Sequence, residues 1–324
     1  MSGLPVNAPR AAATRLHFAD VAVTATANEF KGIYRGKQYH HADFPNTLDR
    51  ALSAGVEKVI LTGMSLHDVS SNLEIAKSRP AGSCFFTIGV HPYHAAEPLA
   101  EGPSYLEKLK DSVDTNLQQD RRHLAAYGEI GLDYDRLNLA DKSTQLATFK
   151  AQLDMFVANQ WDLPLFLHCR NSFDDFVQVM SSYVDALPRR GLVHSFVGSR
   201  EQMEKLVSMN LDVSVNGFSF QTRESLDMVA AIPLAHLQIE TDAPWGDLKP
   251  TSEVVKRYLT NMPTLPASKK KDKWEADSMV KERNESCTIA RIAYIVAGLK
   301  GISVDEVAGA AWENSVKMFR LAES

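Results

Sequence analysis

The segment Pro164-Leu165-Phe166-Leu167-His168-Cys169-Arg170 shows the pattern that decides the fold of this chain. A short apolar run, typical of a buried strand, ends directly in side chains that carry charge or bind protons. One helical pattern, Thr144–Asn159, precedes this run, and another, Ser199–Met209, follows farther along the chain. Strands that alternate with helices are the repeating unit of a parallel sheet covered by helices.

The same kind of apolar run occurs eight times along the chain. The runs are Phe18–Ala25, Lys58–Gly63, Cys84–His91, Leu124–Leu132, Leu163–Cys169, Gly191–Phe196, Leu211–Gly217 and Leu237–Asp242. Eight such units in 324 residues favour a closed (β/α)8 TIM barrel, a single α/β domain, over an open doubly wound sheet. We assign residues 17–324 to the barrel and 1–16 to an N-terminal extension, and we expect a long helical tail from about Ala290 to Arg320.

Composition and charge limit the classes of function. A net charge of −5 and a pI of about 6.1 argue against a protein that coats DNA by charge, but they allow a nuclease whose basic groups line one cleft. The cysteines Cys84, Cys169 and Cys287 lack metal-type spacing, so we expect free thiols in a reducing compartment. The Lys-rich segment near 262–283 is predicted to be a solvated loop, the alternative being a basic lip at the barrel mouth.

The sequence gives weaker indications of location. No apolar run is long enough to span a bilayer, so we expect no association with membranes. The residues through Ala13 lack the apolar core of a signal peptide. They also lack acidic residues and include Arg10, so a mitochondrial presequence is an alternative to a cytoplasmic or nuclear location. No pattern indicates an oligomeric state.

Side chains suited to metal binding follow the apolar residues of four predicted strands. They are Glu129, His168, His194 and Asp242. The carboxyl ends of the strands in a parallel barrel meet at one face, where active sites lie. Buried carboxylates and imidazoles are costly unless they are paired or bind metal. We therefore predict a site for up to two divalent ions, in which imidazoles with carboxylates suit Zn²⁺ or Mn²⁺ and oxygen-rich donors suit Mg²⁺.

Several other residues are candidates for contact with a substrate. Arg170 follows His168, a candidate metal ligand, and is predicted to bind a phosphate through two hydrogen bonds; the alternative is a surface ion pair. His91 is predicted to hydrogen-bond to the substrate, and Arg283 to neutralise a neighbouring phosphate. Trp245 is a candidate for stacking on a base, although a packed position at the barrel rim is favoured. The glycines around Glu129 are expected to let a ligand or ion approach the backbone closely.

Five motifs at the strand ends occur in an order that identifies a family. They are Gly89-Val90-His91-Pro92, Gly128-Glu129-Ile130-Gly131-Leu132-Asp133, Leu167-His168-Cys169-Arg170, Val193-His194-Ser195-Phe196 and Glu240-Thr241-Asp242-Ala243-Pro244. Together they resemble the TatD family of metal-dependent deoxyribonucleases, within the amidohydrolase-like barrels. The later segment Arg283-Asn284-Glu285 resembles the family's Arg-Asn-Glu-Pro motif, with Ser286 at the proline position. The likeness covers nearly the whole chain, apart from the N-terminal extension and the Lys-rich segment.

The resemblance implies hydrolysis of DNA phosphodiester bonds with divalent metal, commonly from the 3′ end of single-stranded or frayed DNA, with endonuclease activity as an addition. It implies that Glu129 is shared between two metal ions and that His168 and His194 bind one of them. Asp242 would bind the other ion and accept a proton from the attacking water, so Glu129 and Asp242 are the predicted catalytic residues.

The first strand departs from the bacterial pattern of this family, which has a His-x-His pair at its end. Thr24 and Thr26 stand at those positions here, and Phe30–Gly36 resembles the eukaryotic branch, which also lacks the pair. Because a hydroxyl is a weak ligand, one metal position should be weak and water-rich, which favours Mg²⁺. Two alternatives stay open: a barrel hydrolase acting on another phosphoester, an amide or a lactone, and a non-catalytic interaction protein.

Overall fold

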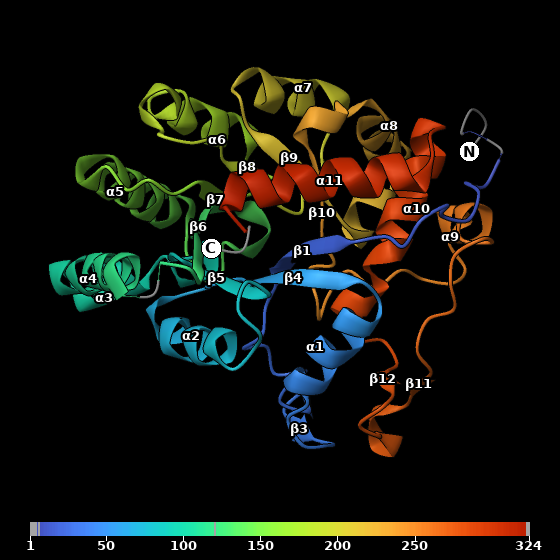
Figure 1. Cartoon of the computed structure of the whole chain (residues 1–324). Coiled ribbons are helices and arrows are strands. Elements are labelled where there is room, and N and C mark those ends of the chain that lie inside the picture. The colour runs from blue at the N-terminus through green and yellow to red at the C-terminus, as the bar shows by residue number, and fades with distance from the viewer. Residues whose placement is uncertain (1–4, 6, 120, 322–324) are drawn as a thin grey trace. The chain divides into compact units, whose positions relative to one another are not determined.

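The computed structural model describes residues 5, 7–119 and 121–321 of the chain. Eight strands follow one another in chain order in one sheet, as a (β/α)8 barrel requires (Figure 1). They are β1 Phe18–Val23, β4 Val56–Leu61, β5 Cys84–Ile88, β6 Leu124–Asp133, β7 Leu165–Arg170, β8 Leu192–Val193, β9 Asp212–Val215 and β10 Leu237–Ile239. Each predicted apolar run overlaps one of these strands, so the predicted barrel is confirmed.

Four neighbouring pairs of barrel strands are parallel, and one bridge links the end of β1 to the residues after β10. The pairs β5–β6, β6–β7, β7–β8 and β8–β9 are all parallel. A parallel bridge joins Val23, at the end of β1, to Ala243, just after β10. Two short pairs stand apart from the barrel sheet: β2 Ile33–Tyr34 with β3 Lys37–Gln38, and β11 Ser268–Lys269 with β12 Met279–Val280.

Helices connect the strands along the chain. The α-helices of the described residues are α1 Phe44–Ser53, α2 Val69–Lys77, α3 Glu97–Glu101, α4 Pro103–Gln119, α5 Lys142–Asn159, α6 Phe173–Met180, α7 Arg200–Ser208, α8 Arg223–Ala231, α9 Glu253–Tyr258, α10 Ile289–Lys300 and α11 Val304–Phe319. The predicted helical patterns 144–159 and 199–209 correspond to α5 and α7. No single described helix is long and apolar enough to cross a membrane; the consecutive segments Ser286–Lys300 and Val304–Phe319 reach that threshold only together, with a bend of 116° between them.

The chain divides into two compact units. The first consists of Met1–Val59, Val197–Glu201 and Val215–Ser315, and the second of Ile60–Phe196, Gln202–Ser214 and Val316–Ser324.

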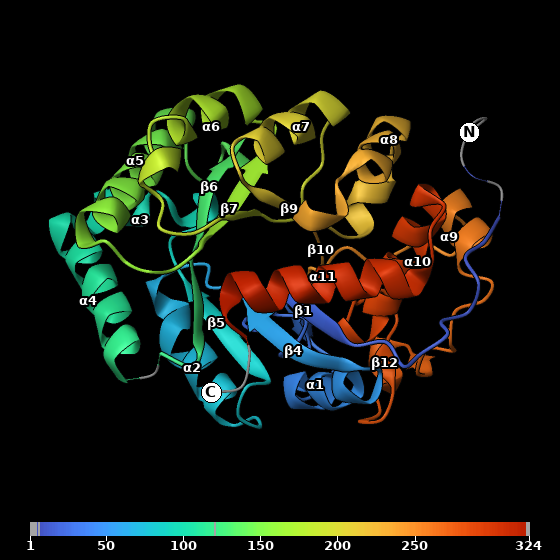
Figure 2. The ribbon, with the colours of Figure 1, turned by 45° about the horizontal axis from the view of Figure 1, so that its top comes forward.

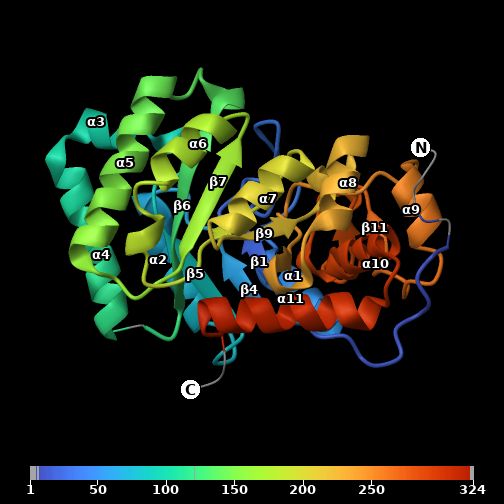
Figure 3. The same cartoon turned by 90° about the horizontal axis from the view of Figure 1, so that it is seen from above.

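In the second unit, helices cover the outer side of the central strands. The helix α2 packs against β5, and α5 packs against β6 (Figure 2). Seen from above, α4, α5 and α6 lie outside β5, β6 and β7 (Figure 3). Aromatic side chains fill the space between these layers: the rings of Phe149 and Phe176 stack with centroids 5.8 Å apart, and those of Tyr127 and Phe156 with centroids 5.4 Å apart. This packing fixes the strands whose ends carry the candidate site.

In the first unit, α10 is buried along most of its length. The predicted helical tail is present, but it consists of two helices, because the chain breaks between α10 and α11. Gly301 ends α10 with φ of 67°, a left-handed conformation that favours glycine. Ser303 and Glu306 then cap the start of α11, since each side chain accepts a hydrogen bond from the other's backbone N–H. In the N-terminal extension, whose residues 1–4 and 6 lie outside the described residues, the Ala12 N–H donates to the Tyr294 hydroxyl over 3.1 Å.

The Lys-rich segment is more ordered than the predicted loop. Ser268–Lys269 and Met279–Val280 form a parallel pair, and Lys271 lies over the rings of Tyr34 and Tyr39. These contacts hold the segment against the short β2–β3 pair while Lys270 and Lys273 stay exposed. The three cysteines are buried and free, as predicted.

Candidate metal centre

Glu129 lies at an irregularity in β6, where the pairing with β7 skips from Gly128 to Ile130. A Cβ atom on Gly131 would lie 2.0 Å from the carbonyl oxygen of His168, and φ of Gly131 is 146°. Gly128 likewise faces the backbone of Phe166. We expected these glycines to admit an ion or ligand, but they let β6 approach the neighbouring strand closely. At this irregularity, the side chains of β6 beside Glu129 no longer alternate regularly between the two faces of the sheet.

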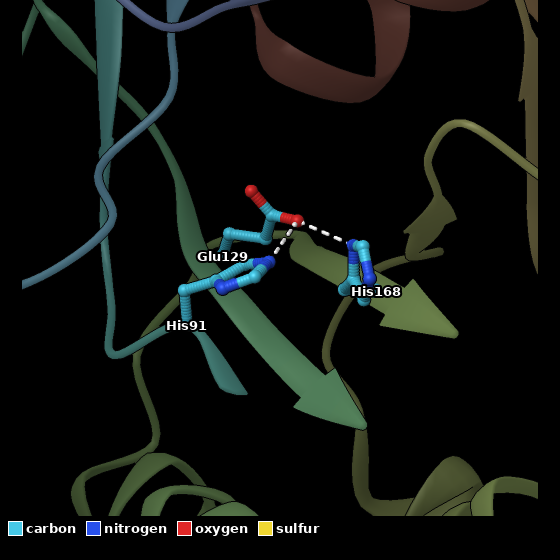
Figure 4. A group of neighbouring side chains, drawn as sticks. All are labelled: His91, Glu129 and His168. Carbon is cyan, nitrogen blue, oxygen red and sulfur yellow. Dashed lines mark ion pairs between the residues drawn. The ribbon is translucent and has the colours of Figure 1, made fainter. Parts of the chain in front are cut away.

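Three imidazoles converge on one oxygen of Glu129. The Oε1 atom lies 3.2 Å from Nε2 of His91, 2.7 Å from Nδ1 of His168 and 2.6 Å from Nε2 of His194. In Figure 4, His91 approaches Glu129 from the loop that follows β5, and His168 approaches it from β7. All four residues are buried and belong to the second unit. The structure therefore brings together Glu129, His168 and His194 as the sequence predicted, and it adds His91.

Asp133 holds His168 from its other side. The Nε2 atom of His168 lies 3.0 Å from Oδ2 of Asp133, so Nε2–H donates to the carboxylate. The Nδ1 atom of neutral His168 then turns a lone pair toward Glu129, whose oxygen also carries lone pairs. Two such atoms only 2.7 Å apart repel each other unless a cation or a proton lies between them. A carboxylate behind an imidazole is the usual outer partner of a metal-binding histidine, so this donor set fits a divalent ion.

His91 differs from His168 in the ring nitrogen that it turns toward Glu129. The backbone N–H of Tyr93 donates to Nδ1 of His91 over 3.1 Å, so Nε2 carries the proton of the neutral ring. Burial lowers the pKa of His91 to about 4, against the opposing charge of Glu129, so the ring is neutral at neutral pH. His91, Glu129 and His168 each offer one possible ligand atom, and these three atoms lie within 4.8 Å of one another. The tautomer nevertheless makes His91 better suited to donate a hydrogen bond than to bind metal.

The electrostatics of the cluster keep its carboxylates ionised. Burial alone would raise the pKa of Glu129, but electrostatic interactions with the imidazoles of His194 and His91 and the hydrogen bonds to His168 and His194 hold it well below its usual range. Burial also opposes ionisation of Asp133, yet the hydrogen bond to His168 lowers its pKa. Burial alone would lower the pKa of His168, but the two carboxylates raise it. A cation and a proton therefore compete for His168.

The remaining predicted metal positions belong to the first unit. The Thr24 N–H donates to the carbonyl oxygen of Ala243 over 2.9 Å, which places the end of β1 beside the residue that follows Asp242. Asp242 has φ of 55°, a conformation uncommon for residues other than glycine and frequent at functional positions. Thr24 is buried, whereas Thr26 and Asp242 are partly exposed. This group offers oxygen donors from a carboxylate and two hydroxyls.

The residues predicted to contact the substrate differ in their burial and in their partners. Arg170 is partly buried at the end of β7, and its charge contributes to lowering the pKa of Asp133. Trp245 is 41% exposed, so the expectation of a packed rim residue is wrong and stacking on a base stays a prediction. Arg283 is fully buried, with nitrogens 2.6 Å from Asp43 and 2.8 Å from Glu285. This burial favours a structural role for Arg283 over the predicted phosphate contact.

The role of Asp133 was not predicted from the sequence, although the motif that contains Glu129 ends on this residue. Its position four residues after Glu129, at the carboxyl end of the same strand, was the available signal.

Comparisons with known proteins give a consistent result. The model of the family described as TatD related DNase matches residues 26–320. The chain is 39% identical over 307 residues to the deoxyribonuclease Tat-D of Schizosaccharomyces pombe, covering 94% of this chain and 96% of that protein. It is 30% identical over 308 residues to the 3′-5′ ssDNA/RNA exonuclease TatD of Erwinia billingiae, covering 93% and 98%. The crystal structure of a hydrolase TatD family protein from Entamoeba histolytica superposes with a TM-score of 0.85 at 31% identity, covering 96% of this chain and all of that one.

Proposed function

We propose, since the chain belongs to the family of TatD related DNases, that it is a divalent-metal-dependent deoxyribonuclease acting from the 3′ end of single-stranded or frayed DNA. The observation that carries the proposal is the convergence of His168 and His194 on one ionised oxygen of Glu129. Two ring nitrogens and a carboxylate, with a second carboxylate behind one ring, form a ligand set for a divalent cation.

Each residue of the cluster has a distinct part in this proposal. Glu129, His168 and His194 hold the ion, and Asp133 fixes the orientation of the His168 ring. When bound, a divalent ion there would polarise a phosphate oxygen and lower the pKa of an attacking water. His91 donates its Nε2–H to a phosphate oxygen of the substrate, and Arg170 pairs with a neighbouring phosphate. Asp242 accepts the proton released by the water, since a carboxylate can serve as the general base of a hydrolysis.

Up to two ions would serve this reaction, and we propose Mg²⁺ as the ion that supports turnover best. Thr24 and Thr26 supply hydroxyls where imidazoles would bind a softer ion, and Mg²⁺ relies on carboxylates, waters and substrate phosphates. Titrating Mg²⁺, Mn²⁺ and Zn²⁺ separately against a labelled single-stranded oligonucleotide tests this choice. The choice is wrong if the enzyme is inactive in Mg²⁺ and fully active in Zn²⁺.

The proposed reaction is tested by digesting oligonucleotides labelled at either end. We expect a 5′-labelled strand to shorten progressively and a 3′-labelled strand to release its label at once, with no reaction in EDTA. Internal fragments from the start would instead show endonuclease action. Small phosphoesters and lactones in the same assay test the alternative substrates, and turnover of those compounds without turnover of DNA would contradict the proposal.

A further inference from the structure

A cavity of about 670 Å³ opens at the amino ends of the strands in the second unit. Its lining residues are Ala81, Gly82, Phe85, Arg121, Arg122, Leu124, Ala125, Leu163, Arg189, Phe319 and Arg320. The volume lies in the range of about 300–1,000 Å³ that is usual for small-molecule sites. Four arginines share this cavity with apolar side chains, and no acidic residue of the described chain lines it.

The cavity lies at the opposite ends of these strands from the metal-binding cluster. Arg121 and Arg122 directly precede β6, whereas Glu129 and Asp133 lie in the middle and at the end of that strand. Leu163 precedes β7 in the same way, whereas His168 lies near its end. Catalytic groups of parallel barrels gather at the carboxyl ends. The proposed hydrolysis therefore does not explain why four arginines gather at the amino ends of these strands.

The charges around the cavity are unbalanced. The carboxylate of Asp162 lies 2.7 Å from Arg320, 3.8 Å from Arg121 and 4.0 Å from Arg189, so three guanidinium groups share one acid. Arg122 is exposed and has no hydrogen-bond or ion-pair partner among the described residues. Burial lowers the pKa of Arg189, and the nearby charges of Arg320 and Arg121 lower it further. An anion that enters the cavity would relieve this repulsion.

Two features of Arg189 and its neighbours give the cavity a fixed shape. The side chain of Arg189 is 16% exposed and donates to the carbonyl oxygen of Lys317 over 3.0 Å, so its guanidinium is held in place. Phe85, Leu163 and Phe319 are nearly buried and form an apolar wall. Guanidinium groups bind phosphate oxygens in pairs and also stack on planar rings.

We propose that this cavity binds a mononucleotide, with the phosphate on the arginines and the base against the apolar wall. A planar ring joined to a phosphate matches both halves of the lining. The inference does not rest on the proposed catalysis, because binding at this cavity needs neither the metal ion nor Glu129.

Calorimetric titration of the full chain in EDTA tests this binding, with deoxyadenosine monophosphate, inorganic phosphate and deoxyadenosine as separate probes. We expect the monophosphate to bind more tightly than either fragment, because each fragment reaches one half of the lining. Inorganic phosphate binding as tightly as the nucleotide would contradict a role for the apolar wall. An absence of monophosphate binding at millimolar concentration would overturn the proposal.

Substitutions of the lining arginines test whether the monophosphate binds in this cavity. Removing a charge-assisted hydrogen bond in Arg320→Gln or Arg122→Gln should weaken monophosphate binding by about tenfold. Arg122 is exposed and without a partner in the described chain, so its replacement leaves the fold intact even if Arg320→Gln does not fold. Arg223→Gln, an exposed i,i+4 pair with Asp227 in α8, removes the same charge elsewhere and should bind like the natural chain. The cavity is not the binding site if the Arg122 and Arg320 variants bind the monophosphate as tightly as the natural chain does. The same conclusion holds if monophosphate binding is lost only in Glu129→Gln.

Discussion

The region formed by β6, β7 and the end of β8 and the region at the carboxyl ends of β1 and β10 carry different donor atoms. The first region, in the second unit, combines the imidazoles of His168 and His194 with the carboxylate of Glu129, all buried. The second region, in the first unit, offers the carboxylate of Asp242 and the hydroxyls of Thr24 and Thr26. Nitrogen-rich donors bind borderline ions strongly, whereas oxygen donors bind hard ions and leave room for water.

Because their donor atoms differ, substitutions in the two regions should have different effects on ion binding and turnover. In the proposed mechanism, loss of a donor from the buried cluster should abolish ion binding there, because an uncompensated buried group would remain. Loss of Asp242 should instead remove the proposed proton acceptor and one weak ligand, while the buried cluster keeps its own donors. Measurements that separate ion binding from turnover can therefore distinguish the regions.

The largest expected effect follows from Glu129→Gln. The neutral amide cannot balance the charge of an ion bound with His168 and His194, so DNA digestion should fall by about a thousandfold or more. Circular dichroism should show an intact barrel. Glu224→Gln, an exposed change of the same kind in α8, is the matched control and should digest DNA normally. Undiminished digestion by Glu129→Gln would remove this residue from the mechanism.

Asp242→Asn should reduce turnover by about a hundredfold, which is the usual contribution of a general base. Binding of Mn²⁺ to the buried cluster, measured by calorimetry, should persist in this variant. Asp227→Asn, an exposed residue paired with Arg223, serves as the control. If Asp242→Asn abolishes Mn²⁺ binding altogether, the two regions do not differ in the way described.

Asp133→Asn tests the orientation of His168. An amide still reaches Nε2 of His168 but no longer balances its charge, so Mn²⁺ affinity should fall by about tenfold to a hundredfold. Turnover at saturating Mn²⁺ should change much less than affinity, because Asp133 acts through His168. An unchanged affinity would assign Asp133 a structural role only.

The smallest effects concern the backbone that carries the cluster. Gly131→Ala would place Cβ 2.0 Å from the carbonyl oxygen of His168, so the free energy of unfolding should fall by about 1–3 kcal/mol. Gly309→Ala, at an exposed position in α11 with nothing within 4 Å of the added atom, should raise it by about 0.5–1 kcal/mol. Denaturant unfolding of both variants measures these values. A stable Gly131→Ala protein would show that β6 can move away from β7.

The sequence predicted the fold and the core of the site for one physical reason. Parallel strands end at a common edge, so Glu129, His168 and His194 could be grouped from their positions after apolar runs. The break in the C-terminal helices was also readable, because Gly301 stands before the Ser303-x-x-Glu306 cap. The apolar periodicity of the two helices alone does not reveal this break, since it continues on both sides of it.

Other features depend on contacts that no local pattern contains. The proton position of His91 follows from one backbone N–H, that of Tyr93. The burial of Arg283 follows from its pairing with Asp43, which lies 240 positions away in sequence. The role of the glycines around Glu129 became clear only from the backbone of β7 beside them.

The most direct test of the metal centre is the anomalous scattering of crystals grown with Mn²⁺. We expect an ion peak about 2.0–2.3 Å from Nδ1 of His168, Nε2 of His194 and a carboxylate oxygen of Glu129. The same preparation should digest single-stranded DNA from its 3′ end. A protein that digests DNA while its only ion lies away from these three residues would contradict the proposed metal centre.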